Sequence, residues 1–95
     1  MRRHVLVAYD IADDKRRNKV AQVMEDHGDR VQYSVFLCQL NGSEQSSLRS
    51  QLRAIVNAAE DQVMLVDLGL ATRDLQGDIT CIGKAYSPPV RAQVI

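Results

Sequence analysis

The chain of 95 residues contains no tryptophan, one phenylalanine and two prolines, and its two cysteines are far apart. Cys38 and Cys81 therefore provide neither a disulfide framework nor the close spacing of a zinc site. Because both lie in apolar stretches, we expect buried free thiols. No apolar run approaches the ~18 residues that span a bilayer, and no signal peptide precedes the first predicted strand. The expected location is the cytoplasm, with no membrane contact.

The chain also lacks an excess of either charge, since twelve basic and twelve acidic residues give a formal net charge of zero. Taken alone, this balance argues against a nucleic-acid-binding protein, because phosphate partners favour an excess of Lys and Arg. The distribution is less neutral, however, because half of the basic residues lie in the first nineteen positions. Arginine outnumbers lysine nine to three. Arginine suits bidentate phosphate contacts, although a GC-rich genome also raises its share.

The hydrophobic pattern predicts alternating strands and helices in one domain, residues 1–95. Strands are predicted at 4–10, 30–40, 62–69 and 79–84, helices at about 14–27 and 43–59, and an extra strand at 90–95. The stretch 30–40 is long for one strand and fits either one bent strand or two short strands.

Local residues predict where each helix begins and ends. Asp13 or Asp14 can cap the first helix, and Gly28 fits a left-handed C-terminal cap. Ser43, after the Asn41-Gly42 turn, can cap the second helix.

This order of elements predicts an α+β fold, the ferredoxin-like βαββαβ arrangement, in which both helices cover one face of an antiparallel sheet. The other face of such a sheet is left bare. Runs such as VLVAY and VMLV are apolar at successive positions, so both faces of these strands require cover. A second copy of the chain can provide that cover, and we therefore expect a homodimer.

Asp10, at the end of the first strand, is the best catalytic candidate. A carboxylate there can bind Mg²⁺, which prefers oxygen ligands and can activate a bound water at a phosphoryl group. One carboxylate is a poor site, whereas two copies of Asp10 meeting across a dimer interface form a reasonable one. The alternative is that Asp10 only caps the next turn.

The other polar and aromatic candidates each have a structural alternative. Tyr9 can stack on a base or simply pack. Arg16 and Arg17 gain nothing from the helix dipole, which suggests phosphate binding, but they also fit a solvated charged face. Asp13 and Asp14 can ligate metal or cap the helix. Glycine-rich phosphate loops and the HExxH, CxxC and RNP1 patterns are absent from the sequence.

Two stretches together resemble the CRISPR-associated protein 2 family: VAYDIADDKRR at 7–17 and GDRVQYSVFLCQL at 28–40. A leucine-rich second helix and the closing RAQVI extend the resemblance to nearly the full length. The resemblance implies a ferredoxin-like homodimer whose C-terminal strand joins the partner's sheet. The domain would then divide into a core at 1–84 and a dimerisation tail at 85–95.

In function, the resemblance implies a protein of CRISPR adaptation. Members of the family bind duplex prespacer DNA and bridge two dimers of the CRISPR integrase (CRISPR-associated protein 1), contacting phosphates and not base sequence. Some members are endonucleases on RNA or DNA that require Mg²⁺ or another divalent cation such as Mn²⁺. By the family motif, Asp10 is the catalytic residue and metal ligand. The resemblance places five nucleic-acid-binding residues around it: Tyr9, Arg16, Arg17, Arg30 and Phe36.

Two other functions share this topology. One is a toxin-like endoribonuclease, which sequence patterns separate only weakly from the scaffold function. The other is a non-catalytic regulatory module of ACT type, which would lack phosphate affinity.

Overall fold

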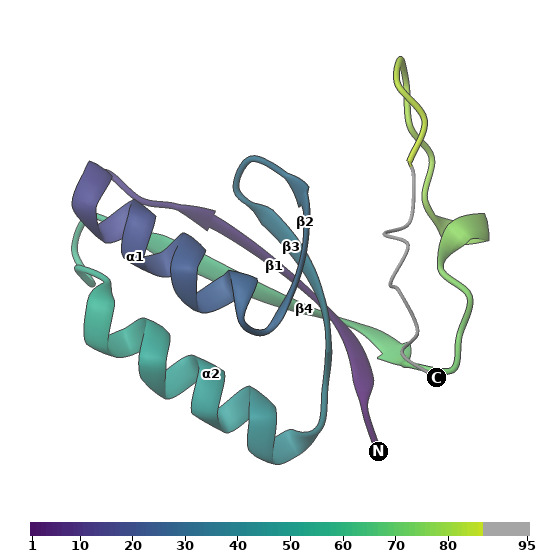
Figure 1. Ribbon diagram of the computed structural model, residues 1–95, viewed down its shortest axis with the longest axis horizontal. Coiled ribbons are helices and arrows are strands. Elements are labelled where there is room, and N and C mark those ends of the chain that lie inside the picture. Colours follow the sequence, from purple (N-terminus) through teal and green to yellow (C-terminus); the bar gives the residue numbers. More distant parts are fainter. Residues whose placement is uncertain (87–95) are drawn as a thin grey trace, which may run out of the picture.

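The computed structural model describes residues 1–86. Its elements in chain order are β1 (Arg3–Asp10), α1 (Asp14–Glu25), β2 (Gly28–Gln32), β3 (Val35–Leu40), α2 (Gly42–Ile55), β4 (Gln62–Leu70) and a short 3₁₀ helix (Gln76–Asp78). The four strands form an antiparallel sheet in the order β2-β3-β1-β4, and both helices cover one face of it (Figure 1). This arrangement confirms the predicted ferredoxin-like fold. None of the helices within residues 1–86 is long and apolar enough to cross a membrane.

The core lies between the sheet and the helix layer. On β1, Val5, Val7 and Tyr9 are buried, because alternate residues of a strand point to the same face. They pack with apolar side chains of β3 and the two helices. The buried cluster comprises Val5, Val7, Tyr9, Ile11, Val20, Met24, Phe36, Cys38, Leu40, Leu48 and Leu52.

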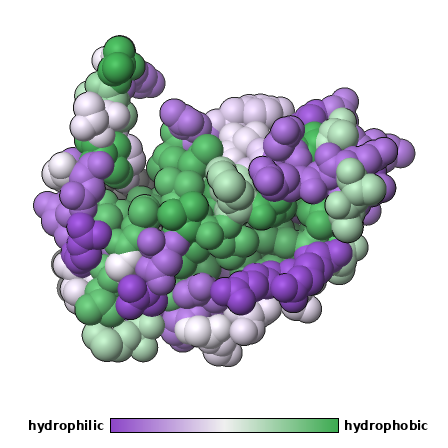
Figure 2. Space-filling view, turned by 180° about the vertical axis from the view of Figure 1, so that it is seen from behind, coloured by the Kyte–Doolittle hydropathy of each residue, from purple (hydrophilic) through white to green (hydrophobic). Residues whose placement is uncertain are grey.

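The opposite face of the sheet, which we call the open face, carries no helix. The intervening residues of β1, ending with Asp10, point to it. On β4 the side chains of Met64 and Val66 are 49% and 39% exposed. Figure 2 shows this face as a broad hydrophobic region with hydrophilic residues along its border. The segment after β4 lies over part of it and encloses a hollow of about 690 Å³.

The stretch predicted at 30–40 contains two strands and not one. β2 and β3 are antiparallel neighbours joined at Tyr33-Ser34, so they form a hairpin. Gly28 is the first residue of β2, and its predicted left-handed cap is wrong, since only Gly69 and Gly83 among residues 1–86 have positive φ. The glycine is required for a different reason. A Cβ at Gly28 would lie 2.5 Å from Cys38 Sγ, which is closer than real contacts permit.

The helix caps show a second difference. Asp13 caps α1 as predicted, its carboxylate accepting from the Arg16 backbone N–H at 3.0 Å. For α2 the predicted Ser43 cap is wrong, because the Asn41 side chain accepts from the Glu44 backbone N–H and the Glu44 carboxylate accepts from the Asn41 backbone N–H. This reciprocal capping box satisfies two amide groups at once. The helix also ends at Ile55, four residues before the predicted Ala59.

The segment that follows β4 differs from the predicted strand at 79–84. Within the described part of the chain these residues form no strand, because none of its four strands pairs with them. Ile82 is fully exposed and Cys81 is exposed, so the prediction of two buried thiols holds only for Cys38. Burial raises the pKa of the Cys38 thiol to about 11, which keeps it protonated and unreactive. The predicted strand at 90–95 lies outside the described residues.

The close approach at Gly28 leads to a stability prediction. Replacing Gly28 with Ala forces a methyl group against Cys38 and the Leu37 carbonyl, so we expect the free energy of unfolding to fall by about 1–3 kcal/mol. Gly42→Ala is the matched control, because a Cβ there meets no atom within 4 Å, and it should leave stability unchanged or raise it. Urea denaturation followed by circular dichroism measures both. Equal stabilities for the two variants would contradict the packing explanation.

Candidate metal and nucleic-acid site at the end of β1

Asp10 ends β1 at the border of the open face, opposite Gln62 of β4. Its side chain is exposed and forms no hydrogen bond or ion pair with any other residue in 1–86. The alternative that Asp10 caps the next turn is therefore not what the structure shows, since Asp13 fills that position. A free carboxylate at the end of a central strand is positioned to bind a cation or accept a proton.

Tyr9 and Phe36 lie on the other side of the sheet from Asp10. Tyr9 is 8% exposed and Phe36 is completely buried, with ring centroids 6.3 Å apart in a stacked arrangement. The Tyr9 backbone N–H donates to the Ser34 carbonyl at 3.1 Å, which ties β1 to the β2–β3 turn. The Tyr9 ring therefore packs in the core against Phe36, as its alternative interpretation expected.

Arg30 lies over the Phe36 ring of this pair and over the neighbouring ring of Tyr33. Its guanidinium carbon lies 5.1 Å from the Phe36 ring centroid and 6.0 Å from that of Tyr33, within the range of a cation–π interaction. The same side chain approaches the Glu25 carboxylate at 3.9 Å. Arg30 remains partly exposed, but it is held by a carboxylate of its own chain.

Arg16 is bound even more tightly within the chain. It donates from Nε and Nη2 to the two carboxylate oxygens of Asp61, at 2.8 and 3.2 Å, and from Nη2 to Glu60 at 3.0 Å. The Asp61 side chain has no exposed surface and also accepts from the backbone N–H groups of Ala12 and Asn57. We call this arrangement the Asp61 clip. It joins the loop after Asp10 to the loop that leads into β4.

Arg17 is likewise engaged. Its Nη1 donates to the Ile11 carbonyl at 3.1 Å, and its Nη2 bonds the Asp14 carboxylate. Arg16, Arg17 and Arg30 thus each have an acidic partner within the chain. For Arg16 and Arg17 the structure adds a contribution that sequence patterns did not indicate, an ion pair within the chain, and phosphate binding by the three arginines stays a prediction.

Sequence analysis did not identify Glu60 and Asp61. They are two adjacent acids directly before a strand whose first residue pairs with Asp10. Their place before a predicted strand was the only sign of a functional position in the sequence. It shows that these acids lie near Asp10 only once the register between β1 and β4 is known.

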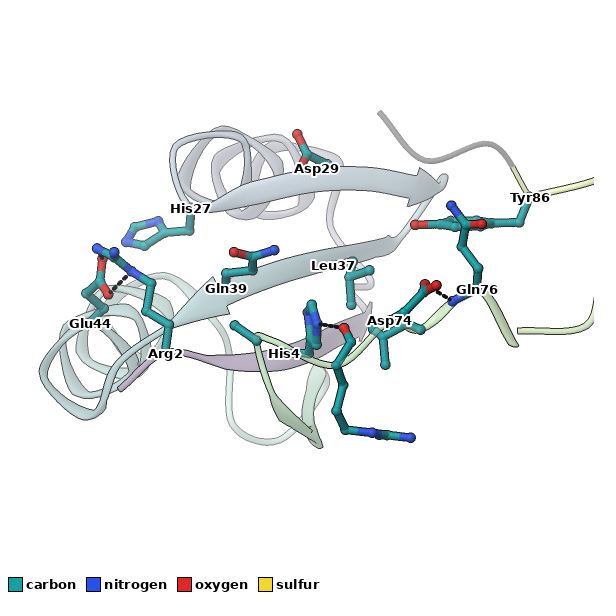
Figure 3. A pocket seen from close by; sticks show the side chains of 13 residues that line it. Arg2, His4, His27, Asp29, Leu37, Gln39, Glu44, Asp74, Gln76 and Tyr86 are labelled. Carbon is teal, nitrogen blue, oxygen red and sulfur yellow. Dashed lines mark hydrogen bonds and ion pairs between the residues drawn. The ribbon is translucent and has the colours of Figure 1, made fainter. Parts of the chain in front are cut away.

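Figure 3 shows a hollow of about 660 Å³. Arg2 and His4 line it at the start of β1, whereas Asp10 ends that strand. His4 lines it and bonds the Arg73 carbonyl through Nε2 at 2.8 Å, which holds the segment after β4 against the open face. At one side Arg2 pairs with Glu44 at 3.0 Å. The described residues around this hollow include none of the six predicted site residues. The candidate site is therefore the border of the open face and not this hollow.

A divalent cation needs more than Asp10 alone. In residues 1–86 no cluster of three or more His, Cys, Asp or Glu side chains could hold a metal ion. Mg²⁺ is commonly held by one or two carboxylates and otherwise by water. The exposed, unpaired Asp10 suits that chemistry, and a second carboxylate from outside the chain would complete such a pair.

The family model described as CRISPR associated protein Cas2 matches residues 2–74. The chain belongs to the Cas2 family. Its relatives include the CRISPR-associated endoribonuclease Cas2 1 of Rhodospirillum rubrum, which is 38% identical over 90 residues that cover 95% of this chain and 87% of that protein. The resemblance inferred from residues 7–17 and 28–40 is thereby confirmed.

Solved structures agree with the Cas2 assignment. Cas2 of Streptococcus pyogenes, crystallised at pH 6.5, superposes with a TM-score of 0.73 at 29% identity and covers 84% of this chain and 99% of that one. A hypothetical protein of Thermus thermophilus superposes with a TM-score of 0.75 at 30% identity, covering 92% of this chain and 100% of that one. Both likenesses support the ferredoxin-like fold of this Cas2 chain.

The Asp61 clip leads to a pH-dependent prediction. Hydrogen bonds from Arg16 and from the Asn57 backbone hold the pKa of the Asp61 carboxyl well below its usual value. The unfolded chain therefore takes up a proton first as the pH falls through about 4, so the stabilisation by the clip is present at pH 7 and lost in acid. Asp61→Asn should lower the melting temperature at pH 7 and flatten its decline between about pH 5 and 3.

Asp67→Asn is the matched control, because Arg3 binds Asp67 at 2.7 Å in a pair that also joins β1 to β4. The Asp67 side chain is 53% exposed, and exposed ion pairs contribute little. Calorimetry across this pH range should show the larger change for Asp61→Asn. A loss of the same size in both variants would contradict the importance of the buried clip.

Proposed function

We propose that this Cas2-family chain acts in CRISPR adaptation as a homodimer that binds duplex prespacer DNA and bridges two dimers of the CRISPR integrase. We further propose that the two Asp10 carboxylates of the dimer together bind Mg²⁺, or another divalent cation such as Mn²⁺, for hydrolysis of phosphodiester bonds. The observation that carries the proposal is the free Asp10 carboxylate at the border of an uncovered apolar sheet face. Family membership supports the CRISPR function, and the ACT-type alternative is dropped.

The dimer is proposed because the open face is hydrophobic and incompletely covered. Met64 and Val66 remain exposed on β4, and Ile82 in the following segment is fully exposed. A second copy placed over the open face would bury these side chains, which is favourable by the hydrophobic effect. It would also bring the two first strands together. Each Asp10 would then approach its counterpart, which supplies the second carboxylate.

The hydrolytic activity is supported by the names of the relatives. The Rhodospirillum rubrum protein is named an endoribonuclease, and a Thermus thermophilus relative, 33% identical over 85 residues, is named an endonuclease. These names leave RNA and DNA both as proposed substrates. A bound divalent cation would polarise the phosphoryl group and lower the pKa of an attacking water. Asp10 from each protomer would hold the cation, and its position at a rigid strand end would keep the two carboxylates in place.

Asp10→Asn separates hydrolysis from scaffolding. Loss of even an outer-shell partner of a metal site lowers metal affinity or activity by about 10–100-fold. Because Asp10 would contact the metal directly, we expect the cleavage rate to fall by at least about 100-fold. Binding of the integrase and of a prespacer duplex should stay within twofold, because the amide keeps the size of the carboxylate. Asp26→Asn is the control, since Asp26 is an exposed acid at the end of α1 without a side-chain partner in residues 1–86.

Cleavage assays with Mg²⁺ or EDTA and co-elution with integrase and duplex measure the two functions. Metal-dependent cleavage that persists in Asp10→Asn would exclude Asp10 as the essential ligand. Spacer acquisition that persists without cleavage would show that hydrolysis is dispensable. Cleavage of RNA without any integrase binding would favour the toxin-like alternative.

The proposed interface is tested at Val66. Val66→Lys places a charge on the apolar open face, where burial without a partner is costly, so the dissociation constant of the dimer should rise at least about tenfold. Ala54→Lys adds the same charge on α2, outside the open face, and should leave the dimer intact. Sedimentation equilibrium measures both dissociation constants. A wild-type monomer, or an unchanged dimer in Val66→Lys, would contradict an interface on the open face.

A further inference from the structure

The arginines in residues 1–86 fall into two groups. Six of those in residues 1–86 form ion pairs with carboxylates of the same chain: Arg2, Arg3, Arg16, Arg17, Arg30 and Arg73. Arg49 and Arg53 have no carboxylate partner among these residues, and neither do the three lysines Lys15, Lys19 and Lys84. The pairing explains how a chain of zero net charge can still present free positive charge. That charge is not at the arginines that the sequence pattern favoured.

Four of the five free cations lie on the helix layer. Lys15 and Lys19 are exposed on α1, one helical turn apart, and Arg49 and Arg53 are exposed on α2 with the same spacing. The two helices pack side by side on the sheet (Figure 1). They run in opposite directions, since α1 follows Asp10 whereas α2 follows Leu40, which pairs with Arg3 at the other end of β1. The start of α1 therefore lies beside the end of α2.

The outer surface of α2 carries no free acid. Glu44 is the sole acidic residue of this helix, and it is engaged by Arg2 and by the capping box. Besides Arg49 and Arg53, the exposed polar residues of α2 are neutral hydrogen-bonding groups: Ser43, Ser46, Ser47, Ser50 and Gln51. Hydroxyl, amide and guanidinium groups are the donors that contact phosphate oxygens in protein–DNA complexes.

The free charges are also arranged unfavourably for the isolated chain. Like charges at i, i+4 destabilise a helix, and both pairs, Lys15 with Lys19 and Arg49 with Arg53, have this spacing. Elsewhere the chain places an acid beside each arginine that it buries or half-buries. A bound polyanion would relieve the repulsion within both pairs.

We infer that the helix layer, chiefly Arg49 and Arg53 on α2 with Lys15 and Lys19 on α1, is the surface that contacts the phosphate backbone of duplex DNA. The inference rests on the proposed function, and it assigns phosphate contact to a face that the expected residues Arg16, Arg17 and Arg30 do not form. It is compatible with a dimer through the open faces, because such a dimer leaves both helix layers outward. The contacts are made to phosphates and not to bases, so the affinity does not depend on the base sequence of the DNA.

The test is the salt dependence of DNA binding. The full chain, as wild type and as the double variant Arg49→Gln/Arg53→Gln, is titrated onto a labelled 30-base-pair duplex at several KCl concentrations. The slope of log K against log salt concentration should become shallower by roughly 0.9 for each phosphate group that the variant no longer neutralises. The reduction in affinity should be equal for duplexes of unrelated sequence. Circular dichroism and urea denaturation check that the variant is folded.

Arg3→Gln/Arg73→Gln is the matched control, because it changes the net charge equally but removes two arginines that pair with Asp67 and Asp78. Its slope should equal that of the wild type. An equal reduction in both double variants would overturn the inference, since the effect would then follow net charge alone. An unchanged slope in Arg49→Gln/Arg53→Gln would overturn it while the proposed DNA binding stands.

Two further outcomes separate this surface from the proposed function as a whole. If wild-type protein shows no salt-sensitive binding to the duplex, the DNA-binding function itself fails and the inference fails with it. If Arg49→Gln/Arg53→Gln binds duplex normally but no longer co-elutes with the integrase, the helix layer docks an acidic protein surface, and the inference is overturned.

Discussion

The alternation of side chains along β1 is the constraint on which the rest of the structure depends. This central strand pairs with β3 on one side and β4 on the other, so its register orients both neighbours. Successive residues must face opposite sides of the sheet. Tyr9 therefore enters the core against Phe36, while Asp10 emerges on the open face. A structural residue and a candidate catalytic residue are adjacent in sequence and separated by the thickness of the sheet.

Most arginines of the described chain pair with carboxylates of the same chain and stabilise the fold. Ion pairs join segments that are distant in sequence: Arg3 on β1 pairs with Asp67 on β4, and Arg16 on α1 pairs with Asp61 in the loop before β4. The Asp61 side chain has no exposed surface and also accepts from the backbone N–H groups of Ala12 and Asn57, so removing Arg16 would leave a buried carboxylate without its ion-pair partner. Arginines near a candidate site are thus partly structural. Positive charge available to a ligand has to be identified by excluding the paired groups.

Much of the fold was predictable from local patterns. Period-two and period-3.6 hydrophobicity predicted the correct order of elements from β1 to β4. Asp13 was identified as one of two candidate caps because such caps depend on neighbouring residues only. Errors arose where two plausible local signals competed, as with Ser43 and Asn41 before α2. Gly28 was misassigned because the need for glycine at this position comes from a tertiary contact. Cys38 and the Leu37 carbonyl of β3 leave no space for a Cβ. The segment 79–84 has strand-like composition but no neighbouring strand within residues 1–86.

The amino-acid sequence by itself determined the Cas2-family motif, the sheet-and-helix order and the place of Asp10 at a strand end. These features depend on residues close together in the chain, where spacing and propensity carry the information. Only the tertiary structure decided which charges are free. Arg16 and Asp61 are 45 residues apart in sequence, and Arg3 and Asp67 are 64 apart. No local pattern encodes such pairs, because they form only when the strand register brings distant side chains within hydrogen-bond distance.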